Sequence, residues 1–205
     1  MAVECRDVIE LLDHLDLAQV AILGTSRGGL NAMGLAMGAK NRLLGVALND
    51  IGPEIDPKGL EVIMGYLGRN PGAKNHTDAA RTMSKRMTHF RNVPKSRWME
   101  EAVKHFRATD AGLQITYDPR LRDAIEAQGA QAAPDLWPFF DAMGGLPLAC
   151  IRGANSDLLT AQTLVQMQRR RPDMISVTVP DRGHIPFLDE PDAIAALQNW
   201  IRELS

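Results

Sequence analysis

The residue that points most directly to chemistry in this sequence is Ser26, in the stretch Gly-Thr-Ser-Arg-Gly-Gly. An apolar run at residues 18–24 leads into this stretch, and small apolar residues follow at helical spacing over residues 30–37. A strand that reverses into a helix within a few residues strains the backbone of its apex residue and exposes that side chain. We therefore predict that Ser26 is a nucleophile at a sharp strand-to-helix turn.

Glycines surround the predicted nucleophile. We expect Gly24 and Gly28 to occupy flanking positions where a side chain would collide, and Gly29 to let the helix pack closely on its neighbour. The backbone N–H of Arg27 then opens the helix, where it can donate to an oxygen that gains negative charge. Because Gly-x-Ser-x-Gly also arises by chance, the alternative is a glycine-rich turn with an incidental serine.

His184 is the predicted general base. A hydroxyl is a poor nucleophile until a base removes its proton. His184 follows an apolar, β-branched run at residues 174–181, so it comes after the carboxyl end of a strand, as Ser26 does. The alternative is a solvated loop histidine. Because the base must be neutral, we expect activity to fall as the pH drops through roughly 6.5.

Asp157 is the predicted acid that orients the imidazole. It follows the apolar run at residues 146–153 and completes the chain order serine, acid, histidine that belongs to this kind of turn. A cap for the helix predicted after it is the other role open to Asp157. Asp50, which ends the apolar run at residues 42–50, is the alternative acid.

These residues require a sheet whose strands end at a common edge. Helical patterns at residues 3–15 and 191–204 flank and alternate with the apolar runs, which predicts an α/β fold with a mainly parallel sheet. We predict that residues 1–51 and 146–205 form this core. Residues 52–145 contain amphipathic segments and little strand pattern, which predicts an inserted helical cap.

Composition excludes several classes of partner. The formal net charge of −2 argues against nucleic acid and anionic membranes, and no apolar run approaches the roughly 20 residues that span a bilayer. The five histidines are scattered and neither Cys5 nor Cys150 lies near one, so we expect no metal and no cofactor. A reduced, buried Cys150 favours a cytoplasmic location. A small molecule is the expected partner.

The stretches "GTSRGG", "LNDIGP", "RGANSDLLT" and "DRGHIPFLDEP" resemble the α/β-hydrolase superfamily, in particular its cap-bearing esterase-like and lipase-like members. The resemblance covers nearly the whole chain. It implies Ser26 as nucleophile, Asp157 as acid and His184 as base. It also implies that residues 52–145 are the lid region of that superfamily.

The resemblance also implies that several strands that normally precede the nucleophile strand are missing. We expect only the C-terminal half of the fold in this core, either because the chain is a fragment or because its true start lies upstream. The nucleophile strand would then be an exposed sheet edge that invites self-association. One oxyanion donor would be absent as well, a loss that costs about 10²–10³ in turnover elsewhere. We therefore expect poor solubility or weak activity from this chain alone.

Taken together, the residues predict a serine hydrolase that cleaves an ester or related acyl bond of a small apolar substrate through an acyl-enzyme. Hydrolysis of a carbon–carbon bond in a diketone uses the same three residues and stays open. The Arg27 side chain either attracts an acidic substrate or, as we favour, points away and pairs with a nearby carboxylate. The alternative of a different class is an inactive α/β-hydrolase-like binding module or a truncated product.

Overall fold

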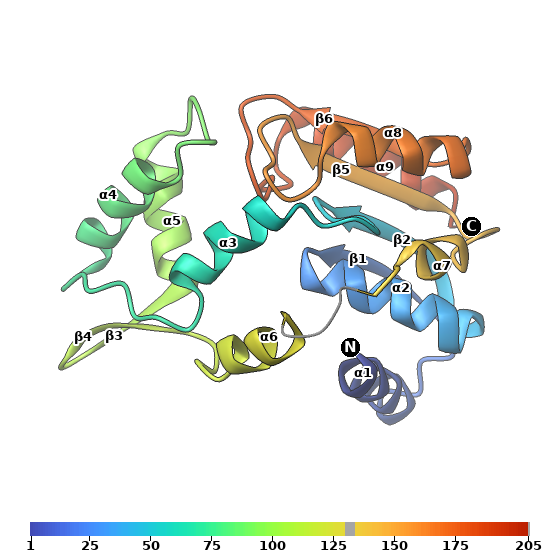
Figure 1. Ribbon diagram of the computed structural model, residues 1–205, viewed down its shortest axis with the longest axis horizontal. Helices are drawn as coiled ribbons and strands as arrows, with labels where there is room; N and C mark the ends of the chain where they lie inside the picture. The colour runs from blue at the N-terminus through green and yellow to red at the C-terminus, as the bar shows by residue number, and fades with distance from the viewer. Residues whose placement is uncertain (130–133, 205) are drawn as a thin grey trace. The chain divides into compact units, whose positions relative to one another are not determined.

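The computed structural model describes residues 1–129 and 134–204 (Figure 1). The chain divides into two compact units, one formed by Met1–Pro57 with the chain from Asp135 onward, and one between Lys58 and Pro134. We call these the first and the second unit. The predicted boundaries, 52 and 145, include more of the chain in the inserted unit than the structure does. The predicted ranges also include residues 130–133 and 205, which lie outside the described residues.

The difference in boundaries has a physical cause on each side. Residues 50–56 stay with the first unit, where the Asp56 N–H donates to the Leu158 carbonyl at 3.0 Å. Before the next strand, helix α7 (Trp137–Asp141) contacts α2 (Arg27–Ala39), and its Phe140 is fully buried. The aromatic residues at 137–140 therefore belong to the first unit rather than to the insertion.

The first unit is built on a four-stranded parallel sheet, in agreement with the predicted strands. The strand order is β1-β2-β5-β6, and all three neighbouring pairs are parallel. The strands are β1 (Val20–Thr25), β2 (Leu43–Asn49), β5 (Leu148–Gly153) and β6 (Ile175–Val179). Strand β1 is an edge of this described sheet, and its Leu23 is 44 % exposed.

Helices cover both faces of this sheet. Alternate residues of a strand point to opposite faces. Ala47 of β2 packs with Trp200 of α9 (Pro191–Arg202), whereas Leu48 lies against the start of α2. Helices α2 and α9 therefore lie on opposite faces. The other helical segments of the first unit are α1 (Ala2–His14), the 3₁₀ turn η1 (Lys40–Arg42) and α8 (Ala161–Arg170).

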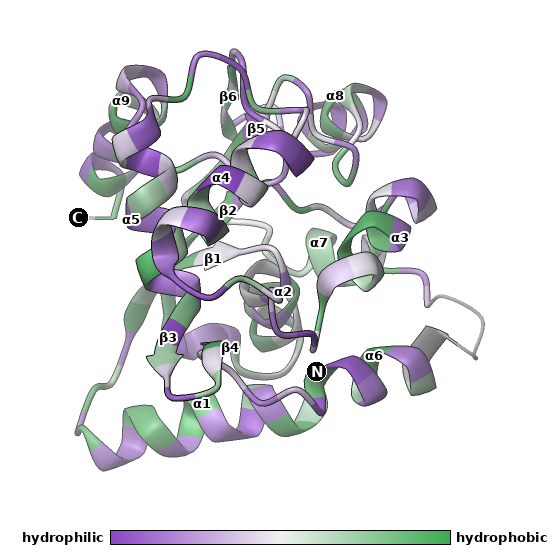
Figure 2. Cartoon of the chain, turned by 90° about the vertical axis from the view of Figure 1, so that its left-hand side faces the viewer, coloured by the Kyte–Doolittle hydropathy of each residue, from purple (hydrophilic) through white to green (hydrophobic). Residues whose placement is uncertain are grey.

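Helix α1 is amphipathic but only lightly buried. Figure 2 shows hydrophobic and hydrophilic residues interspersed along its length. Leu12 is its buried residue, whereas Val3, Leu11 and Leu15 are each more than half exposed. In the part of the chain that the structure describes, no helix combines the length and the apolar character needed to cross a membrane.

The second unit is mainly helical and has its own apolar core. Its helices are α3 (Pro57–Tyr66), α4 (His76–Arg86), α5 (Lys95–His105) and α6 (Leu121–Gly129). Trp98 and Ala102 of α5 are buried against α4. An antiparallel hairpin of β3 (Phe106–Thr109) and β4 (Gly112–Ile115) follows α5. Little strand pattern was expected here, and the hairpin is short, with three of the four β3 residues exposed.

Candidate active site

Ser26 lies at the apex of the turn between β1 and α2. Its φ of 48° and ψ of −116° fall in a region that residues other than glycine rarely adopt. The surrounding backbone holds this conformation, because the Ser26 N–H donates to the Asn49 carbonyl at 3.0 Å and the Ser26 carbonyl accepts from the Gly29 N–H at 2.9 Å. The strained strand-to-helix turn predicted from the sequence is therefore present.

Two of the three glycines around Ser26 are required by space. A Cβ at Gly24 would lie 2.6 Å from the Gly29 Cα, and a Cβ at Gly29 would lie 2.3 Å from a side-chain carbon of Ile51. A Cβ at Gly28 would meet nothing within 4 Å. The prediction that Gly28 prevents a collision is therefore wrong, because the close approach is between Gly24 and Gly29.

His184 links the turn to a buried carboxylate. Its Nε2 lies 2.9 Å from the Ser26 Oγ, and its Nδ1 lies 2.8 Å from Oδ2 of Asp50. The imidazole is only 10 % exposed and the Asp50 side chain is fully buried. With Nδ1 protonated toward Asp50, Nε2 is left as an acceptor for the Ser26 hydroxyl proton. A hydroxyl, an imidazole and a carboxylate thus form one continuous chain of hydrogen bonds.

Asp50 occupies the place expected for Asp157. It follows β2, the direct neighbour of β1, and the pairing of Thr25 with Asn49 brings Asp50 level with Ser26. Asp157 lies in the partly buried segment after β5, one strand further from the nucleophile. The carboxylate that the structure places on the Nδ1 of His184 is therefore that of the alternative, Asp50, in place of the predicted Asp157.

Two groups that the sequence analysis did not single out stabilise the buried Asp50 carboxylate. Its Oδ1 accepts from the Gly153 N–H at 2.7 Å, and its Oδ2 accepts from the Ser156 hydroxyl at 2.6 Å as well as from His184. A buried carboxylate needs such donors to offset its lost hydration. The Ser156 Oγ accepts from the N–H of Leu159 at 3.1 Å, which directs its own proton to Asp50.

The Arg27 side chain pairs with a carboxylate, as we favoured. Its Nε and Nη2 donate to the two Glu4 carboxylate oxygens at 2.5 and 2.9 Å. Partial burial raises the pKa of Glu4, but the Arg27 hydrogen bond and charge outweigh it, so this pKa is lowered overall. The guanidinium is thereby fixed to α1, and the Arg27 backbone N–H is the first amide of α2.

The Cys150 thiol is buried beside the site. Burial, with the Asp50 charge as a smaller cause, raises the pKa of the Cys150 thiol far above its ordinary value, so the thiol stays protonated and unreactive. Within residues 1–129 and 134–204, no three or more His, Cys, Asp or Glu side chains lie close enough together to hold a metal ion.

Comparison with known proteins shows the family of this chain. A model of the family described as "Alpha/beta hydrolase family" matches residues 2–197. The chain belongs to the α/β-hydrolase family. The predicted fold is confirmed, and the chain is an enzyme of the hydrolase class.

Three relatives show how far the likeness extends. An α/β hydrolase of known structure from Novosphingobium aromaticivorans is 35 % identical, with a TM-score of 0.90 over 97 % of this chain and 70 % of its own. A 3-hydroxybutyrate-oligomer hydrolase from Cupriavidus necator is 35 % identical over 92 % of this chain and 67 % of its own length. A 2-(acetamidomethylene)succinate hydrolase from Mesorhizobium japonicum is 25 % identical over 95 % and 68 %.

Proposed function

We propose that this chain is a serine hydrolase that cleaves an ester or related acyl bond of a small, largely apolar substrate through an acyl-enzyme. The observation that carries the proposal is the continuous hydrogen-bonded chain from the Ser26 hydroxyl through His184 to the buried Asp50. A purely structural polar network gives no reason for a strained serine at its end, whereas a nucleophile at a strand-to-helix turn does.

In the first half of the reaction, the Ser26 Oγ attacks the carbonyl carbon of the substrate while His184 Nε2 takes the hydroxyl proton. The tetrahedral intermediate collapses, the bond to the leaving group breaks, and the imidazolium returns the proton to that group. In the second half, His184 takes a proton from water, the resulting hydroxide attacks the acyl-enzyme, and Ser26 leaves with the proton restored.

Asp50 has two tasks in this scheme. Its hydrogen bond to Nδ1 selects the tautomer that leaves Nε2 free to accept, and its charge stabilises the imidazolium that forms in each half-reaction. The hydrogen bonds that Asp50 accepts from Gly153 and Ser156 hold the carboxylate in place. We assign this role to Asp50 in place of Asp157.

The backbone N–H of Arg27 is the proposed donor to the oxyanion. It is the first amide of α2, where the helix dipole and unpaired amides favour negative charge. We also propose that the second unit is the inserted helical cap, and that the protein is cytoplasmic, as the free thiols of Cys5 and Cys150 favour.

The activity of one relative suggests the first substrate class to test. One relative at 35 % identity is a 3-hydroxybutyrate-oligomer hydrolase, so short oligomeric esters of a hydroxy acid are the first natural substrate class to test. Simple p-nitrophenyl esters of short acids report acyl transfer without any assumption about the cap.

The test compares ester hydrolysis by the unmodified chain with that of Ser26→Ala. We expect Ser26→Ala to lower kcat by about 10⁴–10⁶, because the nucleophile is removed. Ser84→Ala, at an exposed serine of α4, is the matched control and should keep full activity. A folded chain with no turnover of any ester would instead support the inactive binding module, and full activity in Ser26→Ala would refute the proposal.

A further inference from the structure

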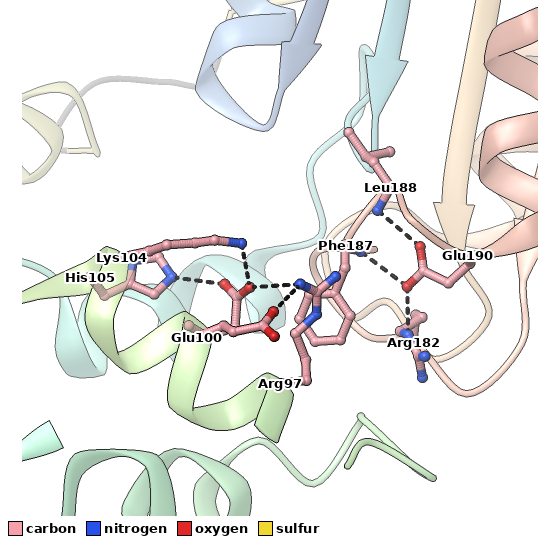
Figure 3. A network of polar contacts seen from close by, with 9 residues as sticks. Arg97, Glu100, Lys104, His105, Arg182, Phe187, Leu188 and Glu190 are labelled. Atoms are coloured by element: carbon pink, nitrogen blue, oxygen red, sulfur yellow. Dashed lines mark hydrogen bonds and ion pairs between the residues drawn. The ribbon is translucent and has the colours of Figure 1, made fainter. Parts of the chain in front are cut away.

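The buried carboxylate of Glu190 links residues on either side of His184 (Figure 3). Oε1 of Glu190 accepts from the Arg182 Nε at 2.6 Å and from the Phe187 N–H at 3.1 Å, and Oε2 accepts from the Leu188 N–H at 2.9 Å. Arg182 precedes His184 by two residues, and Phe187 and Leu188 follow it. The carboxylate therefore joins the two sides of the segment around the imidazole.

The contacts of Glu190 are largely shielded from solvent. The ion pair between Arg182 and Glu190 is largely buried, with side chains 15 % and 8 % exposed. A buried charge is costly unless it is paired and fully hydrogen-bonded, and Glu190 has three donors. The Arg182 guanidinium also lies over the Phe187 ring, 5.2 Å from its centroid. Leu188 has a φ of 71°, a conformation that its bond to Glu190 helps to hold.

The Glu190 carboxylate binds the His184 segment rather than the helix that begins after Glu190. Glu190 is the N-cap residue of α9, where a side-chain oxygen commonly accepts from the first helical amides. Its side chain makes no such cap bond and turns to the His184 segment instead. Two further hydrogen bonds hold the backbone of this segment. The Arg182 carbonyl accepts from the Asn155 N–H at 2.8 Å, and the Pro186 carbonyl accepts from the Asn49 Nδ2 at 3.2 Å.

We propose that Glu190 is a positioning residue for His184: by joining Arg182 to the Phe187–Leu188 backbone, it holds the imidazole within reach of both Ser26 and Asp50. The proposal rests on the proposed function, in which His184 is the general base. Since a displacement of a reacting group by about 1 Å can cost about a hundredfold in rate, loss of this link lowers catalysis without removing any reacting group.

The test measures kcat, KM and the thermal midpoint for Glu190→Ala and Glu190→Gln with a short p-nitrophenyl ester. We expect kcat to fall about a hundredfold in Glu190→Ala and about tenfold in Glu190→Gln, which keeps one acceptor oxygen, with KM nearly unchanged in both. Asp192→Ala is the matched control. It removes an exposed carboxylate from the first turn of the same helix and should keep the kcat of the unmodified chain.

The outcomes separate the two proposals. If Ser26→Ala is inactive but both Glu190 variants keep full kcat, the positioning role is refuted and the proposed function stands. The same holds if Asp192→Ala loses as much kcat as they do, since the loss then belongs to the helix. If Glu190→Ala does not fold, Glu190→Gln decides alone. If Ser26→Ala keeps its activity, the proposed function fails and the positioning role fails with it.

Discussion

The two units differ in what they bury. Among the described residues, six polar or charged side chains are buried, and all of them belong to the first unit: Asn49, Asp50, Arg152, Thr163, Arg171 and Glu190. The buried residues of the second unit are apolar, with Trp98, Ala102 and Leu113 at its centre. Apolar packing is tolerant of detail, whereas each buried polar group demands a partner in a definite place.

The buried polar groups of the first unit fix loops rather than strands. Arg152 donates to the Leu159 carbonyl at 2.7 Å, and Arg171 donates to the Met143 carbonyl at 2.7 Å. Asp50 and Glu190 fix the segments that carry Ser156 and His184. The first unit therefore uses buried charge to place its loops, whereas the described buried residues of the second unit form an apolar core.

The largest expected effect comes from the buried carboxylate at the site. Asp50→Asn should lower kcat by about 10⁴, because the amide cannot hold the required imidazole tautomer or stabilise the imidazolium. Asp157→Asn is the control and should stay close to the unmodified chain. Steady-state ester hydrolysis measures both. A large loss in Asp157→Asn with little loss in Asp50→Asn would return the acid role to Asp157.

The core of the second unit should lose stability when a large side chain is removed from it. Trp98 is 5 % exposed and its ring meets that of Phe90 edge to face at 5.8 Å. Trp98→Ala should lower the free energy of unfolding by about 3–5 kcal/mol, measured by urea denaturation followed by circular dichroism. Val103→Ala, on the same helix but 56 % exposed, should change it by less than about 0.5 kcal/mol. Equal effects of the two substitutions would show that Trp98 is not central to this core.

The glycines of the nucleophile turn should differ from one another. Gly29→Ala places a Cβ 2.3 Å from Ile51 and should destabilise the first unit by about 1–3 kcal/mol. Gly28→Ala meets nothing within 4 Å inside α2 and should be neutral or stabilising by up to about 1 kcal/mol. Thermal and urea unfolding compare the pair. A Gly28→Ala variant as unstable as Gly29→Ala would show that the turn is tighter than described.

The smallest expected effect concerns the edge strand, through which we propose that the chain self-associates. A lysine at position 23 places charge on the exposed side of β1 and should reduce association, seen as a smaller mass by light scattering at increasing concentration. Val165→Lys, at a residue 45 % exposed on α8, should leave association unchanged. If Leu23→Lys associates as strongly as the unmodified chain, this edge is not the contact.

Much of the first unit was predictable because each strand is a short apolar run that ends in a polar or glycine-rich segment. The nucleophile turn and His184 were found in this way. The carboxylate partner of His184 was not, since Asp50 and Asp157 both follow strands, and only the order of strands in the sheet distinguishes them. Chain order pointed to Asp157, whereas strand pairing places Asp50 beside Ser26 and leaves Asp157 one strand further away.

The remaining differences have local causes. The β3–β4 hairpin was missed because Arg107, Ala108 and Thr109 are exposed and show no alternation. Glu190 and Ser156 were not singled out because their roles depend on which backbone amides and side chains lie near them in space. A glutamate before a helix-opening proline gives no indication in the sequence of which groups its carboxylate will accept from.

The proposed mechanism requires Ser26 to be a nucleophile that His184 activates. Reaction of the folded chain with a biotinylated fluorophosphonate, followed by digestion and mass spectrometry, tests it most directly. We expect a single phosphonylated residue, Ser26, and a rate of modification that falls sharply in His184→Ala. Modification at another residue, no modification of the folded chain, or an undiminished rate in His184→Ala would contradict it.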